Sequence, residues 1–528
     1  MVEPPLHFNF VRDVMDRWAS ERPEAVALWV VDSPGGHEQR FSFRQLAESS
    51  RRAASFFARQ GIRRGDRVLV VLPRVPQWWL AMLGLIRLGA VPIPGTALLT
   101  AKDIRLRAEA AEAGAIITDS DGAAKTGDFR GIRICVNAAD AAAAKDGWKD
   151  FDAGLRAADP GFDPEPTHSD APGIIYFTSG TTGHPKMVVH TQASYGLGHR
   201  VTGQLWLDLK PGDVLWTISD TGWAKAAWSS FFGPWQMGAC VFTLGAGGKF
   251  EPVTALQTLA QYPITTWCAP PTALRMIVRE DLSAWRFPHL RHCVSAGEPL
   301  NAEVLNAWRS ATGLTIYEGY GQTESVVLVG NFRSLGHEVR PGWMGRATPG
   351  FELAVLDELL REVPDGEEGE LAVRIAPCRP VGLFREYWHN PAENAGRFCG
   401  DWYLTCDRVI RDAEGYFRFV GRADDVIKSS GYRIGPFEVE SALVEHPTVL
   451  EAGVVGVPDG VRGQIVKAFV VLRKEFAPSD ALRAELQDHC KRVTAPYKYP
   501  REVEFVASLP KTISGKTRHA ELRQRAQP

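Results

Sequence analysis

The sequence reads Thr178-Ser179-Gly180-Thr181-Thr182-Gly183-His184-Pro185-Lys186 directly after the apolar run Gly173-Ile174-Ile175-Tyr176-Phe177. The apolar run predicts a short buried strand, and the polar run predicts a loop. Glycines let a backbone turn so that several N–H groups face one point, and such a nest binds phosphate oxygens. Hydroxyl side chains add donors, and Lys186 adds a mobile positive charge. The stretch predicts a phosphate-binding loop, although an ordinary polar turn has the same composition.

The spacing of this loop separates it from another phosphate-binding motif. The P-loop of many ATPases has Gly, four residues, then Gly-Lys followed by Ser or Thr. Here Gly180 and Gly183 are three residues apart, and Met187 follows the lysine. The sequence therefore predicts phosphate binding through a different arrangement.

Apolar runs alternate with helical patterns on both sides of the loop. Before it, strands are predicted at 68–72, 91–94 and 114–118, and helices at 77–88 and 101–113. After it the pattern restarts, with strands at 212–218, 239–244, 264–269 and 292–295 and helices at 252–262, 271–280 and 301–312. Strands that alternate with helices form parallel sheets. We therefore predict the α/β class, with two related α/β subdomains in a large N-terminal domain.

The C-terminal third of the chain has a different pattern. Short alternating strands within 342–420 predict a small β-rich subdomain. A polar junction follows, and beyond it the apolar spacing predicts a compact α+β domain. We assign residues 1–422 to the N-terminal domain and residues 425–528 to a small C-terminal domain, with the polar junction around Asp424 between them.

The composition excludes several classes of function. The 528-residue chain carries 60 Lys and Arg against 62 Asp and Glu, without a basic stretch, so we expect no nucleic-acid partner. The eight cysteines include no Cys-x-x-Cys pair, which favours reduced thiols in a cytoplasmic protein. The most apolar stretch, 78–94, contains Arg87, and the N-terminus has no long apolar run. We therefore expect neither a signal peptide nor a transmembrane segment, and a homodimer stays open.

A second motif is Tyr317-Glu318-Gly319-Tyr320-Gly321-Gln322-Thr323-Glu324. A Gly-x-Gly turn between aromatic side chains accommodates a flat base. Glu324 supplies a hard oxygen of the kind that Mg²⁺ prefers. Taken alone, a glycine turn with a solvated acid explains the same residues.

Three weaker motifs lie further along the chain. Thr405-Cys406-Asp407 follows a strand pattern, and acidic residues at strand ends accept ribose hydroxyls in dinucleotide-binding folds. Gly421-Arg422-Ala423-Asp424-Asp425 offers an arginine for phosphate or ribose, although a surface salt bridge is the commoner role of a lone arginine. Ser514-Gly515-Lys516 ends a glycine-bearing loop, and a tail lysine is usually just solvated.

The order and spacing of these five motifs resemble the adenylate-forming superfamily of acyl- and aryl-CoA synthetases, non-ribosomal adenylation domains and luciferases. The resemblance covers nearly the whole chain. Residues 218–223, 429–436 and 494–501 are most similar to the medium-chain acyl-CoA synthetases. Cys406 is a departure, because many members have glycine before the aspartate. We expect a local adjustment there that leaves the role of Asp407 intact.

The resemblance implies a two-step ligase that uses small molecules. A carboxylic acid and MgATP first give an acyl-adenylate and pyrophosphate, and coenzyme A then displaces AMP to give a thioester. An alternative is a stand-alone adenylation enzyme that loads an acid onto a carrier protein. Only twelve residues follow Lys516, which argues against a carrier domain in the same chain. The other alternative, an inactive AMP sensor, is disfavoured because every expected charged group is present.

By the same resemblance, the nucleotide-binding residues fall into groups. The β- and γ-phosphates are bound by Thr178, Ser179, Gly180, Thr181, Thr182, Gly183, His184, Pro185 and Lys186. The adenine is lined on one face by Gly297, Glu298 and Pro299 and on the other by Glu318, Gly319 and Tyr320, with Gly321 and Gln322 beside them. The ribose is held by Asp407 and Arg422. The Mg²⁺ ligands are Glu324 and Thr178, and the catalytic residues are Lys516, Thr323, Glu324 and Arg433.

The resemblance also implies that the C-terminal domain rotates about Asp424 between the two steps. After the rotation, Ser430, Gly431 and Tyr432 face the site, and Arg433 lies near the reacting centre. Coenzyme A is then contacted by Arg462, Tyr499, Pro500 and Arg501, although a solvated arginine also explains Arg462.

The acyl pocket is predicted from one position. Acetyl-CoA synthetases carry a tryptophan immediately before Gln-Thr-Glu, and it closes the pocket. This chain has Gly321 there, which predicts an open space. The candidate walls are Trp223, Val326, Val327 and Leu328. We therefore expect an acid larger than acetate: a medium-chain, branched or aromatic acid.

Overall fold

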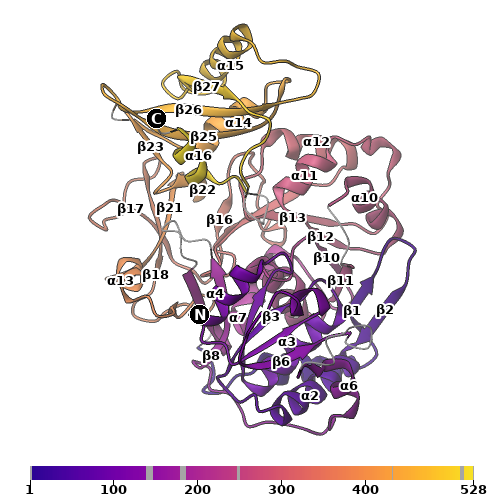
Figure 1. The fold of residues 1–528 in the computed structure, drawn as a ribbon. Helices are drawn as coiled ribbons and strands as arrows, with labels where there is room; N and C mark the ends of the chain where they lie inside the picture. The colour runs from indigo at the N-terminus through magenta and orange to yellow at the C-terminus, as the bar shows by residue number, and fades with distance from the viewer. Residues whose placement is uncertain are drawn as a thin grey trace.

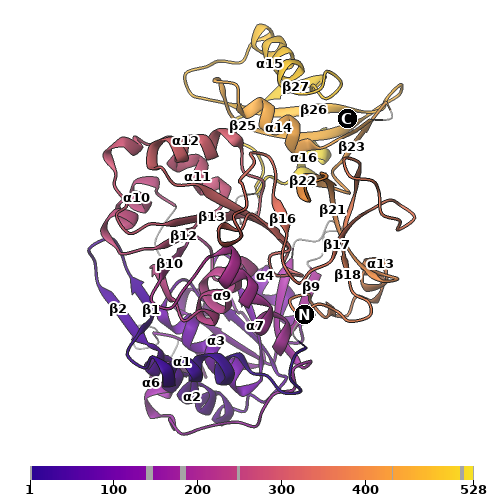
Figure 2. The same ribbon diagram turned by 180° about the vertical axis from the view of Figure 1, so that it is seen from behind.

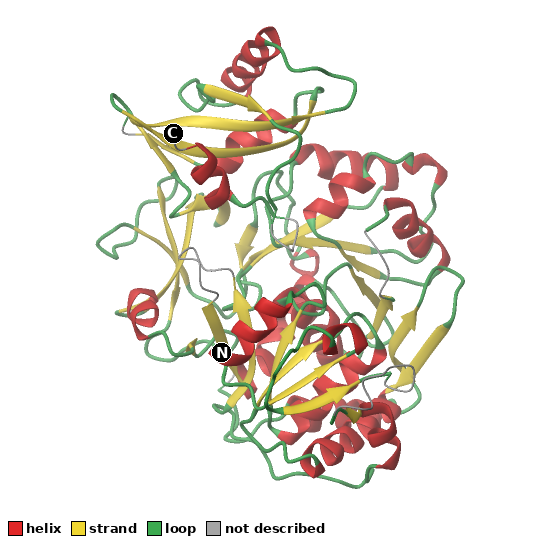
Figure 3. Ribbon diagram, in the orientation of Figure 1, coloured by secondary structure: helices red, strands yellow, loops and turns green. Residues whose placement is uncertain are grey.

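The computed structural model describes residues 3–137, 147–178, 186–245, 250–430, 432–511 and 516–526. Figures 1 and 2 show a large N-terminal part, coloured indigo to orange, with a small C-terminal part in gold above it. The large part contains both helices and strands (Figure 3). The predicted α/β class, with a large N-terminal and a small C-terminal unit, is confirmed.

A parallel sheet forms the centre of the first subdomain, as predicted. Its order is β4 (Val91–Gly95), β3 (Arg67–Val71), β5 (Ala115–Thr118), β6 (Ile132–Cys135) and β7 (Lys149–Asp150). Its helices are α2 (Phe43–Arg59), α3 (Pro76–Leu88), α4 (Ala101–Ala110), α5 (Ser120–Ala123) and α6 (Phe151–Ala157). Every residue of α3 from Trp78 onward is buried, which explains why this stretch is the most apolar of the chain.

A second sheet is larger than the sequence predicts, because it joins the second α/β subdomain and the β-rich segment. Its order is β17 (Leu353–Leu356), β18 (Glu368–Arg374), β21 (Trp402–Arg411), β22 (Tyr416–Arg422), β16 (Gly345–Ala347), β15 (Val329–Gly330), β14 (Ile316–Tyr320), β13 (His292–Ala296), β12 (Thr266–Cys268), β10 (Val214–Thr217), β11 (Cys240–Leu244), β1 (Val26–Val31) and β2 (Glu38–Ser42), with β20 (Phe398–Cys399) on β21. The central strands from β1 to β14 are parallel, and the flanking strands are antiparallel. The short strands β15 and β16 bridge the two segments.

Helices and helical turns surround this sheet. They are η1 (Val11–Met15), α1 (Asp16–Glu21), α7 (Gln192–Val201), η4 (Thr202–Trp206), α8 (Ala224–Ala227), η5 (Trp228–Phe232), α9 (Gly233–Gln236), α10 (Pro252–Gln261), α11 (Pro271–Ile277), η6 (Leu282–Ala284), α12 (Ala302–Thr312), η7 (Arg333–Leu335) and α13 (Pro391–Arg397). Proline at the first turn of α10, α11 and α13 fits helix starts, because its missing N–H needs no partner there.

The predicted strand before the phosphate loop is half of a hairpin. Strand β8 (Pro172–Thr178) pairs antiparallel with β9 (Lys186–Thr191), and β19 (Glu386–Tyr387) extends the pair. Thr178 and Lys186 face each other in the register, so the loop connects two paired strand ends. Residues 179–185 lie outside the described residues.

The C-terminal part has its own sheet. Its order is β24 (Tyr432–Ile434), β23 (Ile427–Ser429), β26 (Gly463–Leu472) and β25 (Val449–Asp459), with β27 (Glu502–Phe505) parallel to β26. Its helices are α14 (Pro436–Val444), α15 (Asp480–Val493) and α16 (His519–Ala526). An apolar cluster that includes Leu443, Val454 and Leu486 forms a separate core. This small core fits a unit that folds around its own sheet.

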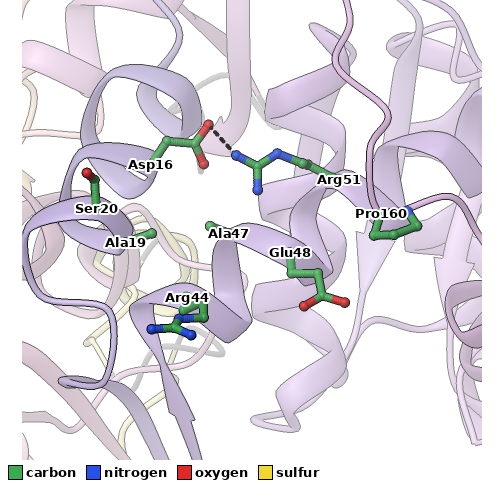
Figure 4. A pocket seen from close by; sticks show the side chains of 8 residues that line it. All are labelled: Asp16, Ala19, Ser20, Arg44, Ala47, Glu48, Arg51 and Pro160. Carbon is green, nitrogen blue, oxygen red and sulfur yellow. Dashed lines mark ion pairs between the residues drawn. The ribbon is translucent and has the colours of Figure 1, made fainter.

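A buried charge pair connects the N-terminal helices to the first subdomain. The Arg87 side chain on α3 is 1% exposed, and its guanidinium donates to Asp16 Oδ1 at 2.6 Å and to Ser50 Oγ at 2.8 Å. Asp16 also pairs with Arg51 at 3.0 Å, at the edge of a surface depression between α1 and α2 (Figure 4). None of the predicted site residues lines this depression, so we assign Asp16 a structural role.

We predict that Asp16→Asn lowers the free energy of unfolding by about 3 kcal/mol, because a buried guanidinium loses its main counter-charge. The control is Asp163→Asn, since Asp163 is half-exposed and lies 3.6 Å from Arg87. That variant should cost less than about 1 kcal/mol. Urea unfolding measures both, and equal losses would contradict the role given to Asp16.

Candidate active site

Asp407 on β21 is the point where three of the predicted motifs meet. Its side chain is buried and accepts hydrogen bonds from Tyr320 Oη at 2.5 Å and from Gln322 Nε2 at 2.6 Å. Arg422 forms an ion pair with it at 3.2 Å. Asp407 and Arg422 are direct neighbours in the register of β21 and β22. The structure thus brings together the motifs at 317–324, 405–407 and 421–425.

The electrostatics of this cluster favour a charged pair. Burial alone would lower the pKa of Arg422, but the combined interactions with Asp407, Tyr320, Glu324 and Asp425 outweigh it and raise that pKa. Burial, reinforced by the charge of Asp407, raises the pKa of Tyr320 well above its usual value. Tyr320 therefore stays a neutral donor. A carboxylate offers about four acceptor positions, so Asp407 retains room for a further hydroxyl.

Thr323 and Glu324 are fixed by residues that the sequence analysis did not single out. The Thr323 carbonyl accepts hydrogen bonds from His190 Nε2 at 2.8 Å and from Tyr195 Oη at 2.6 Å. Burial lowers the pKa of His190 to about 3, so its ring is neutral and its proton faces this carbonyl. Glu324 Oε1 accepts from Tyr387 Oη at 2.8 Å. The available signal was His190 directly after the apolar run Met187-Val188-Val189.

Lys186 begins β9 beside the end of β8, and its ammonium pairs with Glu393 on α13. Arg397 pairs with the same carboxylate at 2.8 Å. These two cations lower the pKa of Glu393 despite its burial. The predicted roles of Ser179 to Pro185 concern residues outside the described part of the chain.

The residues predicted around the adenine lie on two adjacent strand ends. Parallel strands β13 and β14 pair Ala296 with Gly319, so the segments 297–299 and 318–322 lie side by side. Gly297 has a φ of +105°, a left-handed conformation that suits glycine. Glu318 Oε1 accepts from the Leu300 N–H at 3.1 Å. Burial raises the pKa of Glu318 to about 8.

The predicted acyl pocket differs from the expectation at Gly321. A Cβ atom added to Gly321 would lie 2.4 Å from Trp228 Cη2 and 2.4 Å from the Val326 carbonyl oxygen. The space that we expected to be open is therefore filled by the Trp228 ring, which the sequence analysis missed. Trp223 is partly exposed.

The other three predicted walls are fully buried. Val326 and Val327 belong to the main core of the N-terminal part. Leu328 packs into the β-rich core with Val188 and Met344. Val326 and Val327 therefore pack in a different apolar core from Leu328.

Cys406 adopts a backbone conformation that favours glycine. Its φ is +56°, a left-handed value that costs a side-chain-bearing residue some strain. Its Sγ contacts the Arg397 guanidinium, and its N–H donates to Glu370 Oε1 at 2.8 Å. The adjustment predicted at this departure is therefore local, and Asp407 keeps its partners.

Lys516 is exposed, and its positive charge contributes to lowering the pKa of Lys225, whose ammonium donates to the Ala296 carbonyl at 3.2 Å. Lys516 therefore lies within electrostatic range of the end of β13. The N-terminal and C-terminal parts also contact each other directly: Asn301 Nδ2 donates a hydrogen bond to Ser441 Oγ at 3.0 Å.

The residues predicted to meet coenzyme A gather elsewhere on the C-terminal part. Ser430 is exposed, and half-exposed Tyr432 stacks on Tyr497 with ring centroids 4.1 Å apart. The Ser430 N–H donates to the Arg462 carbonyl at 2.9 Å. Arg501 donates to Tyr499 Oη at 2.8 Å, and Pro500 is buried. Gly431 and the side chain of Arg433 lie outside the described residues.

Comparison with known proteins defines the class. The family model for AMP-binding enzymes matches residues 15–388, and that for the C-terminal domain of AMP-binding enzymes matches residues 438–516. The chain therefore belongs to the AMP-binding enzyme family, in the adenylate-forming superfamily predicted from the motifs.

Individual relatives narrow the class. Acyl-coenzyme A synthetase ACSM3, mitochondrial, of Mus musculus is 48% identical over 538 residues, covering 99% of this chain and 91% of that protein. The anthranilate CoA ligase AuaEII, solved with anthranoyl-AMP, superposes with a TM-score of 0.89 at 29% identity, and the match covers 99% of this chain and 98% of that ligase. A benzoate CoA ligase from Burkholderia xenovorans LB400 superposes with a TM-score of 0.85 at 28% identity, and the match covers 98% of this chain and 100% of that ligase. The predicted similarity to the medium-chain acyl-CoA synthetases is confirmed.

The predicted cytoplasmic location is wrong. Relatives from Mus musculus, Homo sapiens and Pongo abelii at 47–48% identity are named as mitochondrial. Reduced cysteines and balanced charge do not separate the cytosol from a mitochondrial compartment, so the composition was not informative on this point. Within the described residues, no helix is long and apolar enough to cross a membrane.

We predict that Gly321→Ala lowers the free energy of unfolding by roughly 1–3 kcal/mol, because the methyl group would overlap the Trp228 ring and a backbone oxygen. Gly396→Ala is the matched control, since nothing lies within 4 Å of a Cβ at that position of α13. There alanine should stabilise, by up to about 1 kcal/mol, through its helix propensity. Urea unfolding gives both values. A neutral Gly321→Ala would mean that Trp228 does not fill this space.

Proposed function

We propose that the protein is an AMP-forming acyl-CoA synthetase that activates medium-chain, branched or aromatic acids. The observation that carries this proposal is the meeting of the predicted motifs at the carboxyl ends of parallel strands β13 and β14. Ligands of open α/β sheets bind at such strand ends. Lys516 lies within electrostatic range of the same edge. The names of the relatives, including an anthranilate and a benzoate CoA ligase, support the reaction and the inclusion of aromatic acids.

In the proposed first step, a carboxylate oxygen of the acid bonds to the α-phosphorus of ATP. The bond from that phosphorus to the oxygen of pyrophosphate breaks, and an acyl-adenylate forms. Both reactants are anions, so cationic groups must neutralise charge where they meet. We assign Lys186 to the terminal phosphates and Lys516 to the carboxylate and α-phosphate. Arg422 and Asp407 receive the ribose.

The residues present fit a magnesium ion brought by ATP. Burial raises the pKa of Glu324, and a bound cation would favour its charged form. No cluster of three or more His, Cys, Asp or Glu in the described parts of the chain could hold a metal by itself. Phosphate oxygens with Glu324 and Thr178 would complete the ligands, which is common for Mg²⁺. The ion would neutralise negative charge on the phosphates.

In the proposed second step, the thiol of coenzyme A attacks the carbonyl carbon of the adenylate, and AMP leaves. The residues assigned to this step are Ser430, Gly431, Tyr432, Arg433, Arg462, Tyr499, Pro500 and Arg501. Of the described ones, Ser430 and Tyr432 are exposed on the C-terminal part, and the proposed rotation would turn them toward the site. We therefore keep residues 1–422 and 425–528 as the two units and Asp424 as the hinge.

The direct test is acid-dependent release of AMP from ATP, with and without coenzyme A. We expect AMP and acyl-CoA with butyrate, hexanoate or benzoate, and a higher kcat/KM for at least one of these than for acetate. Adenylate formation without a thioester, followed by transfer to a carrier protein, would favour the alternative enzyme. Absence of AMP with every acid would contradict the proposal.

We predict that Lys516→Ala lowers the rate of adenylate formation by about 10²–10³, the typical cost of removing one preorganised charge-stabilising group. The same variant, given preformed acyl-adenylate and coenzyme A, should make thioester at the wild-type rate, because the lysine would then have turned away. Lys511→Ala is a control, since Lys511 pairs with Glu451 at the exposed surface. Equal losses in both half-reactions would mean that one arrangement serves both steps.

A further inference from the structure

A second lysine lies at the junction of the acyl and nucleotide regions. Lys225 is on α8, and in the sequence it lies between Trp223 and Trp228. The Trp228 ring fills the space beside Gly321. Its ammonium donates to the carbonyl of Ala296, the last residue of β13. The adenine-lining segment 297–299 begins at the next residue.

The local environment leaves this ammonium short of partners. An ammonium has three donors, and among the described residues the Ala296 carbonyl is its one hydrogen-bond acceptor. Glu298 raises the pKa of Lys225 electrostatically, but its carboxylate forms an ion pair with Arg275 at 3.0 Å. Burial lowers the pKa of Lys225, and the positive charge of Lys516 lowers it further. Partly buried charges without a counter-charge are costly, so an anion at this point would be stabilising.

The position also matches the geometry of the proposed reaction. Ala296 is paired with Gly319 in the register, and Thr323 and Glu324 follow four and five residues later. In the proposed reaction the acid meets the α-phosphate at these strand ends. Its carboxylate would then lie near two lysines, Lys225 on the N-terminal part and Lys516 on the C-terminal part.

We propose, on the basis of the proposed function, that Lys225 binds the carboxylate of the acid and holds it for attack on the α-phosphate. Lys225 belongs to the N-terminal part and stays in place when the C-terminal part turns. Lys516 belongs to the moving part. Lys225 thus captures the acid, and Lys516 joins it for the first step.

The test compares Lys225→Met with wild type by calorimetry and by acid-dependent AMP release. Methionine retains most of the side-chain length and removes the charge. The affinity for the acid should fall about ten- to a hundredfold, as expected for the loss of one charge-assisted hydrogen bond. The affinity for the uncharged primary amide of the same acid should stay unchanged, as should the KM for ATP. Lys225→Arg should recover part of the acid affinity.

Lys125→Met is the matched control. Lys125 is also partly buried, and its ammonium also donates to one backbone carbonyl, that of Ala97, at 3.0 Å. It follows α5 of the first subdomain, which carries none of the predicted site residues. The affinity of the Lys125→Met variant for the acid should equal that of the wild-type protein.

Three results would overturn the inference. An unchanged acid affinity in Lys225→Met would show that the lysine does not bind the carboxylate. Equal losses for the acid and its amide would show a structural role, and a raised KM for ATP with unchanged acid affinity would assign Lys225 to the nucleotide. The binding measurement does not depend on turnover. If the wild-type protein binds the acid but releases no AMP, the proposed function is contradicted. The effect of Lys225→Met on acid binding can still be measured in that case.

Discussion

A buried carboxylate between two strands organises the active region. Asp407 on β21 faces Arg422 on β22, and Tyr320 and Gln322 approach it from the end of β14. A buried charge without these partners would be costly, so the end of β14 and the β21–β22 pair must meet in this arrangement. Gln322 strengthens the connection, because its Nε2 also donates to the Thr405 carbonyl at 2.8 Å. The β-rich segment is therefore held against the parallel strands by polar contacts within the site itself.

The basic side chains of the site differ in the partners that they already have. Arg422 has Asp407, Lys186 has Glu393, and Arg275 has Glu298. Lys225 has only a backbone carbonyl among the described residues. A substrate anion would share Lys186 with the Glu393 carboxylate, whereas Lys225 has no carboxylate partner among the described residues. The absence of a carboxylate partner, among the described residues, thus distinguishes Lys225 from the other basic groups of the site.

Much of the secondary structure could be predicted from periodicity. Strands β3, β4, β5, β10 and β13 and helices α3, α10 and α12 lie close to their predicted positions, because each forms a continuous apolar pattern. The pairing of distant strands could not be predicted. β1 joins β11 more than two hundred residues later, and β15 and β16 are too short to give a pattern. The hairpin around the phosphate loop was also missed, since a strand pattern does not reveal its partner.

The candidate site shows the same limit at the level of side chains. Motif spacing anticipated Asp407, Arg422 and the 318–322 segment, which the structure brings together. It did not anticipate Trp228, because an absent side chain at Gly321 says nothing about which neighbour fills the space. His190 and Tyr195 act through a backbone carbonyl of Thr323, and backbone contacts leave little trace in a motif.

The most direct test of the central role of Asp407 is a crystal structure with a non-hydrolysable acyl-adenylate analogue. The adenine should lie between residues 297–299 and 318–320, and the ribose hydroxyls should be within hydrogen-bond distance of Asp407. The acyl chain should point toward Trp228. A nucleotide bound with its ribose away from Asp407 would contradict the assignment of this cluster as the adenylate site.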